Sequence, residues 1–267
     1  MPEGDTVWLA AQRMHRALAG RPLTRSDLRV PALATTDLTG RTVREVLARG
    51  KHMLTRIEPD LTLRTHFRMD GSWRLVRAGA RWNGGPAHQI RAVLANADWQ
   101  ALGFRLHDIT LLPTAEEADL VGHLGPDVLG PDWDPAEATR RLEADPRRPI
   151  GEALHDQRTL AGVGNLYQNE LVFLAGVTPW TETGDIGTVR SIVDNAHRIM
   201  SANRQHPEQS TTGDLRRGAT HWVYQRAGQP CRRCGTSIRT ARLGTGNYDR
   251  VAFWCPRCQR GPAPKPA

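Results

Sequence analysis

The chain has 267 residues, with a formal net charge of +8 at pH 7 and a pI of about 10.1. Its mean hydropathy is −0.50 and it contains no apolar run long enough to cross a bilayer, which excludes an integral membrane protein and predicts a cytoplasmic one without a signal peptide. The basic balance predicts a polyanionic partner, nucleic acid first, although a merely solvated basic face is the plainer alternative.

The chain begins Met-Pro-Glu. A small second residue usually leads to removal of the initiator methionine, which would make Pro2 a free secondary amine. An α-amino group titrates near pH ~8, so part of it is neutral at physiological pH and can form a Schiff base. The alternative is that this start has no role. From Asp5 to Gly20 the apolar spacing predicts an amphipathic helix capped by Asp5 or Thr6, so Pro2 and Glu3 would precede a helix N-terminus, where anions are favoured.

The segment from Arg41 to about Leu112 is predicted to form short strands, because "TVREVLA", "HMLTRI", "LTLRTHF", "SWRLV" and "QIRAVLANA" carry β-branched or alternating apolar residues between turn signals. This segment contains Lys51. Of the 36 Lys and Arg residues only Lys51 and Lys265 are lysines. A lysine inside the folded part of such an arginine-rich chain indicates a need for a compact ammonium group, with chance retention as the alternative.

A helix-rich middle follows. Thr114 and Glu117 resemble a capping box, and Pro135 suits the first turn of the next helix. The segment "RRPIGEALHDQRTLAGVGNLYQNELVFLAGVTP" predicts a helix, a glycine-bearing turn and a second helix, and "TVRSIVDNAHRIMSAN" predicts another. In "GVGNLYQNE" the glycines allow a close approach to a ligand, and Asn165 is predicted as an N-cap beside N–H groups that could hold a phosphate. Ordinary capping without a ligand is the alternative.

Four cysteines form two C-x2-C pairs separated by twenty residues: Cys231, Cys234, Cys255 and Cys258. Two chelating pairs suit tetrahedral thiolate coordination, and four protein ligands leave no open position, so a structural Zn²⁺ site is predicted. Two disulfides are the alternative, disfavoured without a signal peptide. The residues between the pairs predict a β-hairpin whose arginines, Arg239, Arg242 and Arg250, could contact DNA.

These segments occur in one order: "MPEG", "RGKHML" around Lys51, "LGPDVL", "GVGNLYQNE" and "RVAFWCPRCQ". The chain thereby resembles the formamidopyrimidine-DNA glycosylase and endonuclease VIII family of base-excision repair enzymes over nearly its whole length. The opening "PEG" and the "GSWRL" context resemble the endonuclease VIII branch more closely.

The resemblance implies an α+β multidomain fold. An N-terminal β-sandwich with a leading helix (residues 1–113) would precede a helix-two-turn-helix domain (114–222), a zinc finger (223–260) and a disordered tail (261–267). It also implies a monomeric bacterial enzyme, associated with the nucleoid through DNA binding.

The resemblance further implies the roles of individual residues. Pro2 would be the nucleophile and Glu3 the proton donor, while Lys51, Asn165 and Arg250 would hold phosphates of the lesion. Met69 would enter the emptied base stack, assisted by Arg68 and Asp70; the alternative for Met69 is a core residue.

The chain departs from the family pattern at two places. Thr6 lies where many relatives have glutamate, so no carboxylate role is carried over to it. The segment "WQALGFRLHDITLL" lacks the "DPRRFG"-like signature of the formamidopyrimidine branch, which puts the opposite-strand contacts and a main role on 8-oxoguanine in doubt. The predicted function is therefore a DNA glycosylase and abasic-site lyase acting on oxidised bases, pyrimidines first. The alternatives are oxidised purines as substrates, or a noncatalytic zinc-dependent protein that binds damaged DNA.

Overall fold

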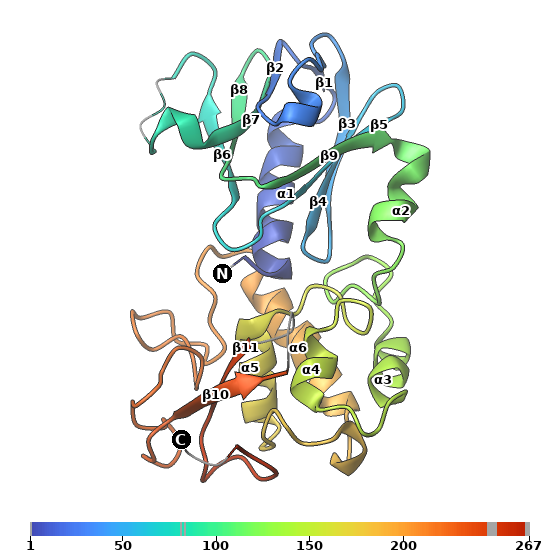
Figure 1. Cartoon of the computed structure of the whole chain (residues 1–267). Helices are drawn as coiled ribbons and strands as arrows, with labels where there is room; N and C mark the ends of the chain where they lie inside the picture. The colour runs from blue at the N-terminus through green and yellow to red at the C-terminus, as the bar shows by residue number, and fades with distance from the viewer. Residues whose placement is uncertain (1, 81, 83, 245–249, 265–267) are drawn as a thin grey trace. The chain divides into compact units, whose positions relative to one another are not determined.

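The computed structural model describes residues 2–80, 82, 84–244 and 250–264, and the chain divides into two compact units, Met1–His123 and Leu124–Ala267 (Figure 1). Among the described residues, no helix combines the length and the apolar character needed to cross a membrane. Short 3-10 turns punctuate both units, at Pro31–Leu33, Ala87–Gln89, Thr114–Glu116 and Thr183–Asp185.

The first unit opens with helix α1 (Gly4–Leu18), which confirms the predicted amphipathic helix. Its buried face follows the helical repeat through Val7, Ala11, Met14 and Leu18. The predicted side-chain cap by Asp5 or Thr6 is wrong. The helix begins at Gly4, so its N-cap is Glu3, whose side chain makes no capping hydrogen bond.

Two antiparallel sheets pack with α1 around one apolar core. The five-stranded sheet has the order β1 (Arg21–Pro22), β3 (Thr42–Arg49), β4 (His52–Ile57), β5 (Leu61–His66) and β9 (Asp108–Pro113). The four-stranded sheet has the order β2 (Arg25–Leu28), β7 (Ile90–Ala95), β8 (Trp99–Phe104) and β6 (Ser72–Arg77). The strands predicted between residues 41 and 112 are confirmed. Two connections matter for the site: the β3–β4 turn, and the 67–71 turn that joins the two sheets.

The predicted helix that starts at Thr114 is shorter than expected, because only α2 (Glu117–Val121) is α-helical. The capping box does not form. Thr114 Oγ1 lies 3.1 Å from Thr62 Oγ1, and the Glu117 carboxylate accepts hydrogen bonds from Arg56 at 2.7 and 2.6 Å. Tertiary partners on the sheet have therefore taken the groups that would have capped the helix.

The second unit contains helices α3 (Pro135–Glu143), α4 (Ile150–His155), α5 (Asn165–Leu174) and α6 (Arg190–Asn203), followed by a hairpin of β10 (Arg239–Leu243) and β11 (Arg250–Trp254). Pro135 occupies the first turn of α3, as predicted. The predicted helix, turn and helix around "GVGN" correspond to α4 and α5. Every residue of α5 from Asn165 to Phe173 is buried, so α5 is the central element of this unit.

Candidate active site and metal centre

Pro2 and Glu3, the predicted nucleophile and proton donor, directly precede helix α1. Pro2 is half-buried, and Glu3 is completely buried at the cap position of the helix. The Glu3 carbonyl accepts the Val7 N–H at 3.0 Å. A buried acidic group directly beside the predicted nucleophile is the arrangement that proton transfer to a reacting sugar requires. Met1 lies outside the described residues.

Lys51 lies in the β3–β4 turn, where Gly50 adopts the left-handed region with φ +58°. A row of ionisable groups adjoins this turn. His52 and His66 are partners across β4 and β5, and their rings meet edge to face with centroids 4.9 Å apart. Arg64 Nε donates to His52 Nδ1 at 2.9 Å, which requires that this ring nitrogen carry no proton.

Both histidines are held in the neutral form. Burial, aided by the positive charge of Arg64, lowers the pKa of His52 to about 3. Burial, with the charges of Arg64 and Arg68, lowers the pKa of His66 to about 4. Lys51 adds to the effect on His66. Because His52 and His66 are neutral, neither imidazole adds a positive charge beside Lys51 at neutral pH.

These pKa shifts predict a loss of stability in mild acid. The folded pKa values lie below the ordinary value of 6.5, so the unfolded chain binds more protons below that pH and stability falls as pH drops from 6.5 towards 4 and 3. We expect a loss of up to about 2 kcal/mol for each histidine at pH 5. Urea unfolding at pH 7 and pH 5 measures it, with His52→Asn and His66→Asn combined as the non-titrating control. An equal loss in wild type and control would refute this origin.

Met69 lies in the 67–71 turn with 70% of its surface exposed. The alternative of a core methionine is therefore wrong. Large exposed hydrophobic side chains are few among the described residues, and Met69 is the most exposed of the three that occur. An isolated apolar tip on an otherwise polar loop is compatible with insertion into a base stack.

In the second unit, Asn165 and the zinc hairpin come together. Asn165 is the first residue of α5 rather than its N-cap, which is Gly164, so the predicted cap is wrong. Asn165 Nδ2 instead donates to the Val251 carbonyl at 3.1 Å, beside the exposed Arg250. Asn169, one helical turn on, donates to the Asn165 carbonyl and accepts the N–H of β11 residue Phe253, both at 2.6 Å. Helix α5 and strand β11 therefore place Asn165 and Arg250 in one neighbourhood, as the predicted phosphate contact requires.

A cavity of about 10 Å³ lies under Arg250, bounded by α4, α5 and the hairpin. Its lining residues are Gly151, Glu152, His155, Gln168, Leu243 and Arg250. The fully buried Gln168 has an Nε2 group without a hydrogen-bond partner among the described residues. A space of this size holds one water molecule, which this donor would fix.

The four cysteines form one cluster, with their sulfur atoms all within 4.8 Å of one another. Sγ of Cys231 lies 3.9 Å from that of Cys258, and Sγ of Cys234 lies 3.4 Å from that of Cys255. Thiolates about 2.3 Å from a tetrahedral Zn²⁺ are about 3.8 Å apart, so the arrangement fits the ion. All four are free thiols gathered in one cluster, an arrangement that favours the metal site over the two-disulfide alternative. Residues 239–243 and 250–254 between the pairs form two antiparallel strands, as predicted, and the turn predicted to join them lies outside the described residues.

The sequence reasoning missed Glu170, which joins α5 to the segment leading into the zinc hairpin. Its fully buried carboxylate accepts the N–H groups of Trp222, Val223 and Tyr224, each at 2.8 Å, and the Thr211 hydroxyl. Its place five residues after Asn165 on a buried helix is the only signal in the sequence, because its partners lie about 40 to 54 residues away.

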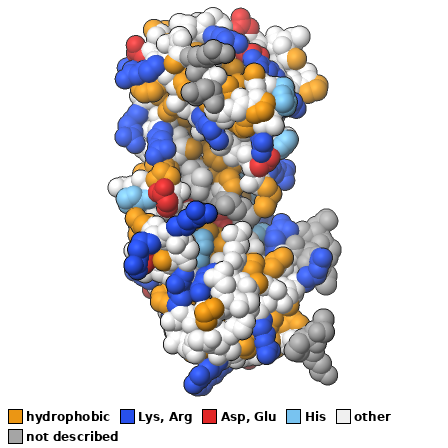
Figure 2. Space-filling model, turned by 90° about the vertical axis from the view of Figure 1, so that its left-hand side faces the viewer, with side chains coloured by type: hydrophobic (Ala, Val, Ile, Leu, Met, Phe, Trp, Pro, Cys, Tyr) orange, Lys and Arg blue, Asp and Glu red, His pale blue; other side chains and the backbone are white. Residues whose placement is uncertain are grey.

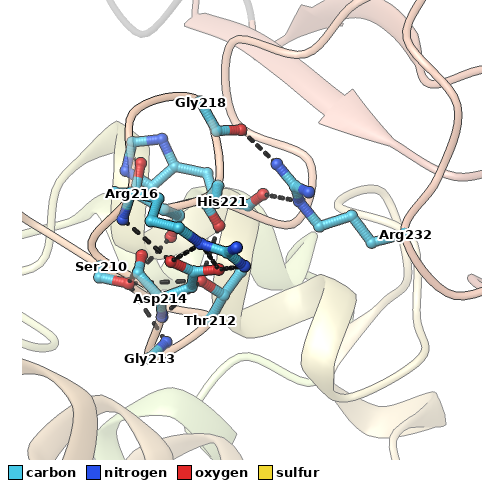
Figure 3. A network of polar contacts seen from close by, with 10 residues as sticks. Ser210, Thr212, Gly213, Asp214, Arg216, Gly218, His221 and Arg232 are labelled. Carbon is cyan, nitrogen blue, oxygen red and sulfur yellow. Dashed lines mark hydrogen bonds and ion pairs between the residues drawn. The ribbon is translucent and has the colours of Figure 1, made fainter.

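The segment between α6 and the hairpin forms its own polar network (Figure 3). Ser210 Oγ donates to the Asp214 carbonyl at 3.0 Å, and the Asp214 carboxylate pairs with Arg216 at 2.6 Å. Arg232, from the zinc finger, donates to the carbonyls of His221 and Gly218. The zinc finger and this loop are therefore ordered together.

Replacing Glu170 with alanine is expected to destabilise the protein by about 3–5 kcal/mol, because three main-chain donors lose their acceptor in a buried position. Glu170→Gln keeps one acceptor oxygen and should cost roughly half as much. Urea unfolding measures both, with the exposed Glu208→Ala as a matched control. A Glu170→Ala protein as stable as this control would contradict the anchoring role.

On the face shown in Figure 2, Lys and Arg side chains are much more frequent than Asp and Glu side chains. This agrees with the net charge of +8. The basic side chains occur singly and in small groups, which is compatible with contacts along an extended polyanion.

Comparison with known proteins defines the family. The formamidopyrimidine-DNA glycosylase N-terminal domain matches residues 1–125, the H2TH domain of that glycosylase matches 124–212, and the zinc finger found in this glycosylase and in isoleucyl-tRNA synthetase matches 228–261. The chain belongs to the formamidopyrimidine-DNA glycosylase and endonuclease 8 family, which confirms the resemblance and the fold class.

Among the relatives, the probable endonuclease 8 2 of Streptomyces coelicolor is 58% identical over 100% of this chain and 96% of its own length. The DNA-(apurinic or apyrimidinic site) lyase Nei2 of Mycolicibacterium smegmatis is 46% identical over 97% of this chain and 99% of its own. A crystal structure of Lactococcus lactis Fpg with DNA containing N7-benzyl-Fapy-dG has a TM-score of 0.79 at 25% identity, covering 97% of this chain and 100% of that one. The higher identity to the endonuclease 8 2 and Nei2 proteins places this chain in the endonuclease 8 branch.

Proposed function

We propose that this protein is a bifunctional DNA glycosylase and abasic-site lyase that uses Pro2 as its nucleophile. The observation that carries the proposal is the completely buried Glu3 carboxylate, which follows Pro2 directly at the start of α1. A buried acid directly beside an N-terminal secondary amine supplies the two groups that the reaction needs, a proton donor and a nucleophile.

The proposed chemistry divides base removal and strand cleavage between these groups. The Pro2 lone pair forms a bond to C1′ while the glycosidic bond breaks. The electron pair of the glycosidic bond leaves with the base, which takes up the proton that the Pro2 nitrogen loses. Glu3 protonates O4′ as the sugar ring opens, and a C1′–N iminium forms. A secondary amine has no further N–H to lose at this stage, so the iminium keeps its positive charge. This charge acidifies the C2′ hydrogen. The Glu3 carboxylate that remains after protonation of O4′ takes this proton as the C3′–O bond breaks and the 3′ phosphate leaves. Loss of a second sugar proton, from C4′, then expels the 5′ phosphate.

Phosphate binding is assigned, by the family pattern, to Lys51, Asn165 and Arg250. Lys51 supplies a compact charge from the β3–β4 turn, next to histidines held neutral. The hydrogen bond from Asn165 to Val251 supports a joint contact with Arg250. The base itself has to leave the stack before Pro2 can reach its sugar, which is easiest for a damaged pair.

The zinc site is proposed to hold one structural Zn²⁺. Four thiolates fill a tetrahedral shell and leave no place for a reactive water, so the ion would order the hairpin that carries Arg250. The protein is proposed to act as a monomer on DNA in the bacterial cytoplasm, associated with the nucleoid.

The proposed lesion class is oxidised pyrimidines, because the chain lies in the endonuclease 8 branch and lacks the "DPRRFG"-like signature. Single-lesion duplexes containing thymine glycol, 5-hydroxyuracil or 8-oxoguanine test this choice, and faster release of 8-oxoguanine would reverse it. A duplex with a preformed abasic site tests the enzyme itself. Absence of strand cleavage at every protein concentration would favour the noncatalytic alternative.

Lys51→Arg keeps the charge but changes the shape and hydration of the cation. We expect it to slow base removal by about tenfold, which corresponds to about 1.4 kcal/mol of transition-state stabilisation, while a preformed abasic site is cleaved nearly normally because less chemistry remains. Single-turnover rates on the two substrates measure this difference. Wild-type rates on both would show that any cation suffices at this position.

A further inference from the structure

The 67–71 turn is built to hold Met69 away from the protein surface. Arg68 has a left-handed backbone with φ +53°, which is unfavourable for a residue with a Cβ. Two hydrogen bonds stabilise this conformation: the Arg68 N–H donates to His66 Nδ1 at 3.0 Å, and the Gly71 N–H donates to the Phe67 carbonyl at 2.8 Å. The tip of the turn is therefore Met69.

Both neighbours of Met69 are tied to one segment, residues 105–108 before and at the start of β9. Arg68 Nη2 donates to Asp108 Oδ2 at 2.9 Å. On the other side, Asp70 lies 3.5 Å from His107 Nε2 and 3.8 Å from Arg105. Met69 is thus flanked by two polar attachments to the same stretch of chain.

Asp108 is the firmer of the two attachment points. It pairs with Arg64 through its second oxygen, and the Arg64 side chain is only 11% exposed. Asp108 is also the direct partner of His66 in the β5–β9 register. Arg64 in turn donates to His52, beside Lys51. The attachment of the turn therefore continues into the rigid part of the five-stranded sheet.

We propose that Asp108 is a positioning residue that, through Arg68, holds the 67–71 turn in the conformation in which Met69 acts as a wedge against the DNA stack. The inference rests on the proposed function and on the role that the family resemblance implies for Met69, which is to enter the emptied base stack. An apolar wedge has to unstack bases, and a turn already ordered before contact loses less conformational freedom on binding. Arg68 and Asp70, on either side of Met69, contact residues 105–108 and so hold the tip of the turn in place, while Met69 itself stays free to enter the stack.

The test separates wedge insertion from catalysis. A duplex carries a tetrahydrofuran abasic analogue, which cannot form the iminium, opposite 2-aminopurine, whose fluorescence rises when it is unstacked. Stopped-flow mixing with the wild type should give a rise, and Met69→Ala should abolish it. Asp108→Asn and Arg68→Gln should each slow the rise by ~2–5-fold, as expected for loss of a half-exposed ion pair. Arg68→Lys should restore most of the rate.

Two comparisons show whether the effect runs through the Arg68–Asp108 pair. The double variant Asp108→Asn with Arg68→Gln should be no slower than Asp108→Asn alone, because both changes remove one interaction. Arg21→Gln, which breaks the exposed Arg21–Asp98 pair in the same unit, should leave the rate unchanged. Arg68 is exposed, so its variant remains informative even where Asp108→Asn lowers the melting temperature.

The outcomes distinguish this inference from the proposed function. Wild-type rates for Asp108→Asn and Arg68→Gln, together with a lost signal for Met69→Ala, would overturn the positioning role and leave the wedge intact. Equal signals for wild type and Met69→Ala would overturn the wedge and the positioning role together, without touching the chemistry at Pro2.

Discussion

Protein that retains Met1, or carries one extra residue before Pro2, is expected to cleave abasic DNA no faster than the background measured without enzyme. The physical reason is the state of the Pro2 nitrogen. As a free secondary amine it has a basic lone pair, whereas in a peptide bond the lone pair is delocalised into the carbonyl and cannot attack C1′. Mass spectrometry establishes the N-terminus, and gel-resolved single-turnover cleavage measures the rate.

The matched control is the affinity of the blocked protein for DNA. The blocked protein keeps Lys51, Asn165 and Arg250, so its affinity for a duplex with a tetrahydrofuran site should stay within a few fold of the wild type. Pro2→Gly, processed to a free N-terminus, keeps a primary amine and should retain partial activity. A blocked protein that cleaves at the normal rate would refute the role of Pro2.

Cys255→Ser is the second change with a large expected effect. Structural Zn²⁺ sites contribute about 10–16 kcal/mol of apparent binding free energy to local folding, so the loss of one thiolate should release the ion and disorder the hairpin of β10 and β11. Arg250 then loses its position. A charge-assisted hydrogen bond is worth about 1.5–3 kcal/mol, so we expect DNA affinity to fall by at least about tenfold.

Zinc content by atomic absorption and fluorescence anisotropy on tetrahydrofuran-containing DNA measure the two effects. Cys255 is completely buried and packs with Phe173 of α5, so the loss should also lower the stability of the second unit. The first unit should keep its fold, because its core of α1 and the two sheets is its own. Undiminished DNA affinity in a zinc-free protein would contradict the structural role of the metal.

The sequence predicted the elements whose pattern is local. Helix α1, the strands from β3 to β7, and the helices around "GVGN" each carry a hydrophobic period that packing preserves. The two cysteine pairs predicted the cluster of four sulfur atoms, because the spacing within each pair is a local pattern. The rarity of lysine in the chain predicts a specific role for Lys51.

The sequence failed where tertiary partners decide. Thr114 and Glu117 look like a capping box, but Thr62 and Arg56 of the sheet take their side chains. Asn165 looks like an N-cap, but its side chain bonds the zinc hairpin 86 residues away. The role of Glu170 is invisible for the same reason. Hydrogen bonds of this range leave no periodic trace in the chain.

The same limit applies to Asp108. It follows a short loop at the start of β9, and only the β5–β9 register brings it opposite His66 and within reach of Arg68. Nothing in "FRLHDITLL" distinguishes this aspartate from a solvated turn residue. Its contacts appear only when the strands are paired.

The most direct measurement of the central claim is borohydride trapping on a duplex with an abasic site, followed by peptide mapping of the adduct. Sodium borohydride reduces the iminium to a stable amine, which locks the enzyme to the sugar at the attacking nitrogen. With Pro2 as the nucleophile, the modified peptide is the N-terminal one, begins at Pro2 and lacks Met1. An adduct on Lys51, or no adduct from protein that cleaves the same duplex, would contradict the mechanism.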